Sequence, residues 1–268
     1  MHPVSNSTTA ALKPLKWYKR LATKKGRVEA GAFLVEGEKA VSQIATANPD
    51  QILEIITTNE LSTTYGNYST RYLTESQFRS ICTSKTPQGT MVLVRLPADL
   101  YSQRLPEHRG NKILLLEDIQ DPGNVGTLIR TAGAFGFSGI ILTERCVDPL
   151  SPKCVQASAG SVLSVWMRRT SRYLELTEIL KSDGFTLVAA DLNGVHDLSI
   201  LAHCKKLLLG LGNEASGISE QLKAASHHRL KLPIVREKAE SLNVAVSGAI
   251  LMYLNSRKPG GDSRLTGA

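Results

Sequence analysis

From Lys112 onward, the chain alternates short apolar runs with segments of helical periodicity, and this alternation constrains the fold more than any other feature. The run Ile113 to Leu116 is wholly aliphatic, as expected for a strand buried on both faces of a parallel sheet. Such an order is typical of a doubly wound α/β domain with five or six parallel strands. The predicted strands are 113–116, 139–143, 164–167, 186–190, 206–211 and 229–232, and the predicted helices are 127–135, 151–159, 173–182, 219–225 and 242–257.

The front third of the sequence predicts a second, smaller α/β domain. The segment from Pro97 to Asn111 has two prolines, one glycine and little apolar periodicity, which is typical of a linker. We therefore expect a front domain at 1–97, a linker at 98–111 and a larger domain at 112–268. In the front domain, helices are predicted at 11–25, 37–47 and 75–82, and strands at 33–35, 52–57 and 90–96.

Positive charge is concentrated at the N-terminal end. The whole chain has 32 Lys plus Arg against 24 Asp plus Glu, a formal net charge of +8, and residues 1–97 supply 12 against 7, or +5 of it. A polyanion is the partner that such a surplus favours, and the rings of Trp17 and Tyr18 would stack on bases, although a solvated amphipathic helix is the alternative. The predicted RNA-binding residues are Lys13, Lys16, Trp17, Lys19, Arg20, Lys24, Lys25 and Arg27.

Other features argue for a protein of the reducing cytoplasm. The four cysteines show no zinc-ligand spacing, so we expect free thiols and no metal. The N-terminus lacks the apolar core of a secretory signal, and the longest apolar stretch, Val244 to Leu254, is too short to span a membrane. We expect neither a membrane nor DNA as a partner.

Three loops that follow predicted strands contain the residues expected of a ligand site, because open parallel sheets bind ligands beyond the carboxyl ends of their strands. The loop at 117–126 has carboxylates, an amide and two glycines, the loop at 210–217 has glycines and one carboxylate, and the loop at 232–243 leads into the last helix. Loop 210–217 reads GxGxxxxG, which breaks the dinucleotide fingerprint, and Gly217 is followed by Ile218 rather than the lysine of a P-loop. A nicotinamide-dependent oxidoreductase is therefore disfavoured.

Each of these loops carries a motif, and together the motifs resemble those of one family. NxGxxxRTA begins at Asn124, GNExxGIS at Gly212, and ESLNVAV at Glu240 after Pro233. They are similar to the motifs of the SpoU (TrmH-like) RNA ribose 2′-O-methyltransferases of the SPOUT superfamily. The front domain resembles the L30e-like substrate-binding domain that precedes many SpoU domains, on the segments 33–37 and 86–89.

The resemblance implies a Rossmann-like sheet that ends in a C-terminal trefoil knot, and a homodimer in which the knot regions pack together. It implies S-adenosylmethionine as cofactor, held in the knot by Gly212, Leu232, Ile234 and Leu242. Glycine permits a close backbone approach, and the aliphatic side chains suit adenine. Segment 234–240 departs from the family pattern, because it is charged and lacks the usual glycine.

The same resemblance implies a catalytic site made of five residues. Arginine is almost always protonated, so we favour Arg130 as a clamp for the target phosphate that also orients the hydroxyl, with general base as the second role. The implied catalytic residues are Asn124, Arg130, Glu214, Ser241 and Asn243. The predicted function is 2′-O-methylation of structured RNA, with 23S rRNA favoured over tRNA and a catalytically idle RNA-binding protein as the rival hypothesis.

Overall fold

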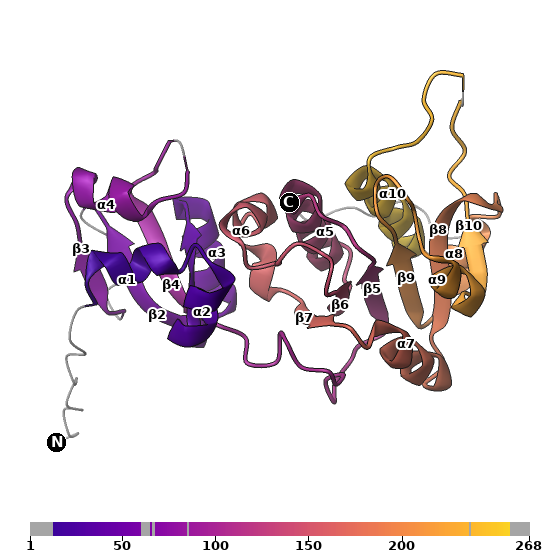
Figure 1. Cartoon of the computed structure of the whole chain (residues 1–268), viewed down its shortest axis with the longest axis horizontal. Helices are drawn as coiled ribbons and strands as arrows, with labels where there is room; N and C mark the ends of the chain where they lie inside the picture. The colour runs from indigo at the N-terminus through magenta and orange to yellow at the C-terminus, as the bar shows by residue number, and fades with distance from the viewer. Residues whose placement is uncertain (1–12, 60–64, 66–67, 85, 236, 258–268) are drawn as a thin grey trace.

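The computed structural model describes residues 13–59, 65, 68–84, 86–235 and 237–257, and it contains two sheets (Figure 1). The smaller sheet has the strand order β1-β4-β2-β3. Strand β4 runs antiparallel to β1 and β2, whereas β3 is parallel to β2. The sequence pattern did not predict β3. The strands are β1 (Ala32–Glu36), β2 (Ile52–Thr57), β3 (Thr70–Tyr72) and β4 (Thr90–Arg95).

Helices cover both faces of the smaller sheet. Tyr18 of α1 and Phe78 of α4 pack on one face, and Val41 and Ile44 of α3 pack on the other. The single helix predicted over 11–25 is wrong within the described residues, because Leu21 to Thr23 interrupt it and the Thr23 hydroxyl accepts a hydrogen bond from Gly26 to begin a new helix. Residues 11 and 12 lie outside the described part. The helices are α1 (Leu15–Arg20), α2 (Lys24–Ala30), α3 (Glu38–Ala47) and α4 (Glu75–Ile81), with a 3₁₀ turn at Pro49–Gln51.

The larger sheet has six strands in the order β10-β8-β9-β5-β6-β7, and every neighbouring pair is parallel. This confirms the predicted doubly wound parallel sheet. Strand β7 begins two residues later than predicted, because a 3₁₀ turn occupies Ser161–Leu163. The strands are β5 (Lys112–Leu116), β6 (Gly139–Thr143), β7 (Trp166–Thr170), β8 (Thr186–Val195), β9 (Leu207–Leu211) and β10 (His228–Leu230).

The two faces of the larger sheet are covered by different helices. Helices α5, α6, α8 and α10 share one apolar core, whereas α7 and α9 pack on the opposite face. The sequence pattern missed α8, and α5 begins at Pro122 instead of 127 because Asp121 caps it. The helices are α5 (Pro122–Ala134), α6 (Pro152–Ser158), α7 (Tyr173–Ser182), α8 (Ser199–His203), α9 (Glu220–Ala225) and α10 (Val244–Ser256).

The two sheets are joined by a segment that is bound along its length. The backbone N–H of Arg169 donates to the Leu100 carbonyl at 2.7 Å. The Arg168 guanidinium donates to the Arg104 carbonyl at 2.7 Å, and the Trp166 indole donates to the Arg109 carbonyl at 3.1 Å. Irregular chain therefore lies along β7, the edge strand of the larger sheet. This contact covers the unpaired edge of the larger sheet.

No helix in the described ranges is long and apolar enough to cross a membrane. The same ranges contain no group of three metal-ligating side chains. All four cysteines are free thiols.

Candidate active site

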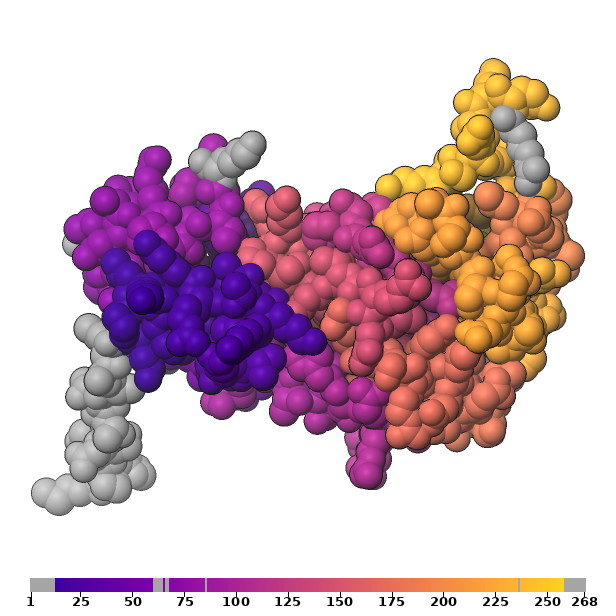
Figure 2. All heavy atoms as spheres, viewed as in Figure 1, coloured from indigo at the N-terminus to yellow at the C-terminus, as the bar shows by residue number. Residues whose placement is uncertain are grey.

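The three motif loops meet at the carboxyl edge of the larger sheet, between β5 and β9. These two strands are neighbours, yet the helices that follow them, α5 and α9, lie on opposite faces of the sheet. Such a switch point leaves a crevice between the two loops, which is where open α/β sheets bind ligands. The described residues between β10 and α10, 231–235 and 237–243, project from the larger sheet (Figures 1 and 2).

A chain of hydrogen bonds links one residue from each motif. The Asn124 amide donates to Glu214 Oε1 at 2.8 Å, and the Asn243 amide donates to Asn124 Oδ1 at 2.9 Å. Asn243 also caps α10, since its Oδ1 accepts from the backbone N–H of Ala245 at 2.9 Å and of Val246 at 3.3 Å. Three of the five predicted catalytic residues are thus in direct contact, although they are up to 119 positions apart in the sequence.

The second motif loop is a tight turn that needs glycine. Asn213 and Gly217 form an isolated β-bridge, and a Cβ added to Gly212 would lie 2.3 Å from the carbonyl carbon of Gly217. Because that obstacle is backbone, the turn has no room for a side chain at position 212. The Asn213 amide ties the turn to the first motif loop by donating to the Asp118 carbonyl at 2.9 Å.

Glu117 holds the end of the same turn in place through Ser219, and the sequence did not predict this role. Its carboxylate is buried and accepts bonds of 2.7 Å from the Tyr173 hydroxyl and from both the backbone N–H and the hydroxyl of Ser219. Burial raises the pKa of Tyr173 to about 12, and the bond to Glu117 adds to the rise. An acidic residue directly after a buried apolar strand was the available indication of such an anchor.

A cavity of about 480 Å³ lies between the second and third motif loops. This volume falls within the range of about 300–1,000 Å³ that is usual for small-molecule sites. The predicted cofactor residues, one predicted catalytic carboxylate and one predicted catalytic hydroxyl all line this cavity: Gly212, Leu232, Ile234 and Leu242, with Glu214 and Ser241.

Two predicted catalytic residues stand apart from the hydrogen-bonded chain. The Arg130 side chain on α5 is exposed, and within the described part of the molecule it has no hydrogen-bond or ion-pair partner. Ser241 faces the cavity, but its expected hydrogen bond within the site is not formed with any described residue. Arg236, in the segment that departs from the family pattern, lies outside the described residues.

The predicted RNA-binding residues divide into exposed and buried groups. Arg20 is exposed but forms an ion pair with Glu29. The Trp17 indole is half-buried, with the Lys13 ammonium 5.9 Å from its ring centre. The side chains of Lys13, Lys16, Lys19, Lys24 and Lys25 are exposed.

Arg27 and Tyr18 require corrections. Arg27 is 2% exposed, forms an ion pair of 2.8 Å with Asp148 and donates to the Leu21 and Ala22 carbonyls, so its guanidinium is used inside the protein and not on RNA. Tyr18 is 1% exposed and donates its hydroxyl to Glu54, so its ring cannot stack on a base. Helical periodicity did not reveal that these side chains face inward.

A parallel sheet with a cavity at its switch point is typical of α/β enzymes, and the exposed lysines near the N-terminus favour a polyanion as partner. Comparison with known proteins specifies the class. Residues 111–253 match the SpoU rRNA Methylase family, and residues 13–92 match the MRM3-like substrate binding domain. The chain therefore belongs to the SpoU family: it is an RNA ribose 2′-O-methyltransferase that uses S-adenosylmethionine.

Individual relatives agree with this assignment. The 23S rRNA (guanosine(2553)-2′-O)-methyltransferase RlmP of Bacillus subtilis is 31% identical over 242 residues, which are 89% of this chain and 94% of that protein. A Porphyromonas gingivalis structure described as a TrmH-family RNA methyltransferase is 30% identical with a TM-score of 0.76, covering 92% and 98% of the two chains. An AdoMet-bound rRNA methyltransferase from Sinorhizobium meliloti is 26% identical with a TM-score of 0.77, covering 92% and 95%.

Proposed function

We propose that this protein methylates a ribose 2′-hydroxyl of 23S rRNA, with the transfer taking place at the edge of the cavity between the second and third motif loops. One observation carries the proposal: Glu214 lines that cavity and also accepts the hydrogen bond from Asn124, so the cofactor cavity and the chain of catalytic residues share a side chain. The 23S substrate is supported by the similarity to RlmP over most of both chains.

The cavity suits S-adenosylmethionine in its chemistry. Leu232, Ile234 and Leu242 offer apolar surface to the adenine ring, and the backbone around Gly212 offers amide and carbonyl groups at close range. Such residues would hold the cofactor without any metal. The bound cofactor supplies an electrophilic methyl group on a sulfonium.

The protein's own residues orient the acceptor. A ribose hydroxyl is a weak nucleophile until its proton is drawn away, so a group that positions it lowers the barrier. We assign Arg130 to the neighbouring phosphate, because its exposed guanidinium is unpaired among the described residues and remains cationic. Asn124, Glu214 and Asn243 then fix the loops that carry the site, and Ser241 is available to bond the cofactor or the ribose.

The two domains would have different roles. We propose that residues 1–97 bind RNA through their exposed lysines, that 98–111 connect and position the two parts, and that 112–268 hold the cofactor and catalyse transfer. The enzyme would act in the cytoplasm, where ribosomal RNA is found in bacteria such as those of the relatives above.

We propose that the protein forms a homodimer through helix α10. Val246, Ile250 and Tyr253 of α10 are 48%, 37% and 43% exposed and are spaced as one helical stripe. We propose that this stripe packs on a second copy and that the chain around it forms the trefoil knot of the family. Light scattering should give twice the chain mass for the native protein, and a monomer for Ile250→Glu.

Mapping of 2′-O-methyl groups tests the proposed substrate. Purified protein with S-adenosylmethionine should create one alkali-resistant position in unmodified 23S rRNA and none in tRNA. A methylated tRNA with unmodified rRNA would favour the tRNA alternative. Absence of methylation in both, with RNA binding retained, would identify an idle RNA-binding protein.

A further inference from the structure

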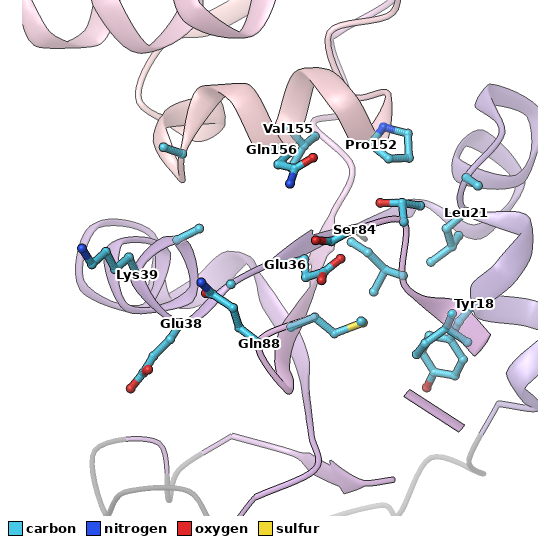
Figure 3. Close-up of a pocket in the computed structure, with 18 of the residues that line it drawn as sticks. Tyr18, Leu21, Glu36, Glu38, Lys39, Ser84, Gln88, Pro152, Val155 and Gln156 are labelled. Carbon is cyan, nitrogen blue, oxygen red and sulfur yellow. The ribbon is translucent and has the colours of Figure 1, made fainter. Parts of the chain in front are cut away.

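A second cavity, of about 600 Å³, lies between the front domain and α6 of the larger domain, away from the motif loops (Figure 3). Its front-domain wall contains Glu36, Ser84 and Gln88, and Gln156 of α6 faces them across the space. Leu34, Met91 and Val155 add apolar surface to the lining. Neither the cofactor site nor the hydrogen-bonded catalytic chain uses any of these residues.

Contacts between the front domain and the larger domain flank the cavity. On one side the buried pair Arg27–Asp148 joins the domains at 2.8 Å, and Asp148 also accepts from the Tyr101 hydroxyl at 3.1 Å. On the other side Gln43 donates to Ser161 at 3.2 Å, and a Cβ added to Gly160 would lie 3.0 Å from the Cα of Ala40. The space is therefore part of a packed interface, and a ligand would find it preformed.

Two of the polar side chains that line the cavity are free to bind. Within the described ranges, the amides of Gln88 and Gln156 have no hydrogen-bond partner. The Glu36 carboxylate has the Cys82 thiol as a neighbour, and burial, followed by the charge of Glu36, raises the pKa of that thiol to about 12. The thiol therefore stays protonated near neutral pH and bonds to Glu36, and the remaining lone pairs of the carboxylate are the acceptors of the cavity.

The chemistry of the lining matches an unstacked RNA base. RNA-binding proteins recognise bases by placing them between apolar or aromatic side chains and bonding their Watson–Crick edge. A carboxylate accepts hydrogen bonds but donates none, so it favours an edge with adjacent donors. Among the four standard bases, guanine alone presents two adjacent donors there, N1–H and the 2-amino group, while the two glutamine amides can donate to its O6.

The cavity also lies where RNA is expected. Leu21 and Ala22, which line it, belong to the turn between α1 and α2, and exposed Lys19 and Lys24 flank that turn. Exposed Lys39 contributes to the lining from α3. An RNA backbone passing over these lysines would place a base at the mouth of the cavity.

We propose that this interdomain cavity binds an unpaired guanine of the substrate RNA, at a nucleotide other than the one that is methylated. Glu36 accepts from the Watson–Crick edge of the base, and Gln156 supplies a contact from the larger domain. The inference rests on the proposed RNA substrate. By spanning the domain junction, the bound base would set which ribose reaches the catalytic site.

Binding of short RNAs to the full-length protein tests this site directly. The probes are fluorescent uridine hexamers with either no substitution or one guanosine, inosine or adenosine at the third position, measured by anisotropy without cofactor. The guanosine hexamer should bind about tenfold more tightly than the all-uridine one, which is the discrimination usual for a bidentate base contact. Inosine, which lacks the 2-amino group, should lose most of that preference, and adenosine all of it.

Two variants test whether the guanosine preference arises in this cavity. Glu36→Gln should abolish it and Gln156→Ala should reduce it severalfold. Asp50→Asn should keep it, because Asp50 is an exposed carboxylate that does not line the cavity. Equal binding of all hexamers by the native protein would overturn the proposal, and so would a guanosine preference that survives in both cavity variants. Gln156 is exposed on a helix surface, so its variant tests the site even if Glu36→Gln fails to fold.

The result of the hexamer test can be told apart from the result of the methylation test of the proposed function. A guanosine preference without methyl transfer to any RNA would leave the cavity assignment standing and reject the 23S rRNA substrate. Methyl transfer to 23S rRNA without a guanosine preference would support the proposed substrate and reject the cavity assignment.

Discussion

At the scale of single residues, Gly212 gives the most specific prediction about the cofactor. Its missing side chain leaves room for the turn that ends at Gly217, and a Cβ would collide with backbone. Gly212→Ala should therefore weaken S-adenosylmethionine binding at least about tenfold, in line with the cost of about 1–3 kcal/mol for overpacking a tight site. Calorimetric titration measures this. Gly210→Ala is the matched control and should bind normally, because a Cβ there would lie no nearer than 3.5 Å to a neighbouring atom, that of the Leu222 side chain.

Tyr173 predicts how stability depends on alkaline pH. The folded protein raises its pKa from 10.0 to about 12, so the neutral phenol is favoured in the native state. The stability it contributes is complete below pH 10 and is lost as the pH rises through 12. Tyr173→Phe should lower the free energy of unfolding by about 1 kcal/mol at pH 8 and lose less stability than the native protein between pH 9 and 11. Urea unfolding at these pH values checks it, and parallel pH profiles would contradict it.

The predicted catalytic residues show what motifs alone can bring together, while their role in catalysis stays a prediction. Asn124, Glu214 and Asn243 were identified by motif and prove to be hydrogen-bonded to one another. Glu117 was missed because its role depends on Tyr173 and Ser219, whose proximity only the folded sheet creates. Arg27 was misassigned because charge composition does not distinguish a solvated guanidinium from one paired with a residue 121 positions away.

At the scale of secondary-structure elements, the ion pair between α2 and the loop before α6 predicts a strong energetic coupling between these two segments. The side chains of Arg27 and Asp148 are 2% and 12% exposed, so removing one charge leaves the other buried and poorly compensated. Arg27→Ala should lower the free energy of unfolding by about 3 kcal/mol. Arg20→Ala, which breaks an exposed pair with Glu29, should change it by less than about 1 kcal/mol. Denaturant titration of the two variants provides the comparison, and equal effects would refute the coupling.

Elements were predicted best where apolar periodicity was continuous. The helix Tyr173–Ser182 has the predicted bounds, and four of the six large-sheet strands lie within two residues of theirs. Strand β7 is shifted toward the C-terminus, and β8 runs five residues further than predicted, to Val195. Short elements such as Thr70–Tyr72 and Ser199–His203 were missed, because so few residues carry no period of their own and depend on their neighbours for stability. The start of α5 was placed late since Pro122 and Gly123 resemble a loop until Asp121 caps them.

At the scale of the whole molecule, charge placement predicts the salt dependence of RNA binding. Replacing Lys13, Lys16, Lys19 and Lys25 together with glutamine keeps the buried residues of α1 and α2. The slope of log K against log salt should fall by up to about 3, since each lost phosphate contact removes about 0.7–0.9. Filter binding at several salt concentrations gives the slope. Lys205→Gln with Lys206→Gln, two exposed lysines directly before β9 of the larger sheet, should leave the slope unchanged. An unchanged slope in the quadruple variant would show that its four replaced lysines do not contact the RNA.

The central claim is that methyl transfer depends on Arg130, which we assign to the target phosphate, whereas cofactor binding in the cavity does not depend on it. Single-turnover transfer of a labelled methyl group from S-adenosylmethionine to 23S rRNA tests it most directly, with cofactor affinity measured on the same preparations. Arg130→Ala should slow transfer at least about 100-fold, the lower range for a positioned catalytic group, while the cofactor dissociation constant changes less than about threefold. Transfer at the native rate by Arg130→Ala would contradict the account.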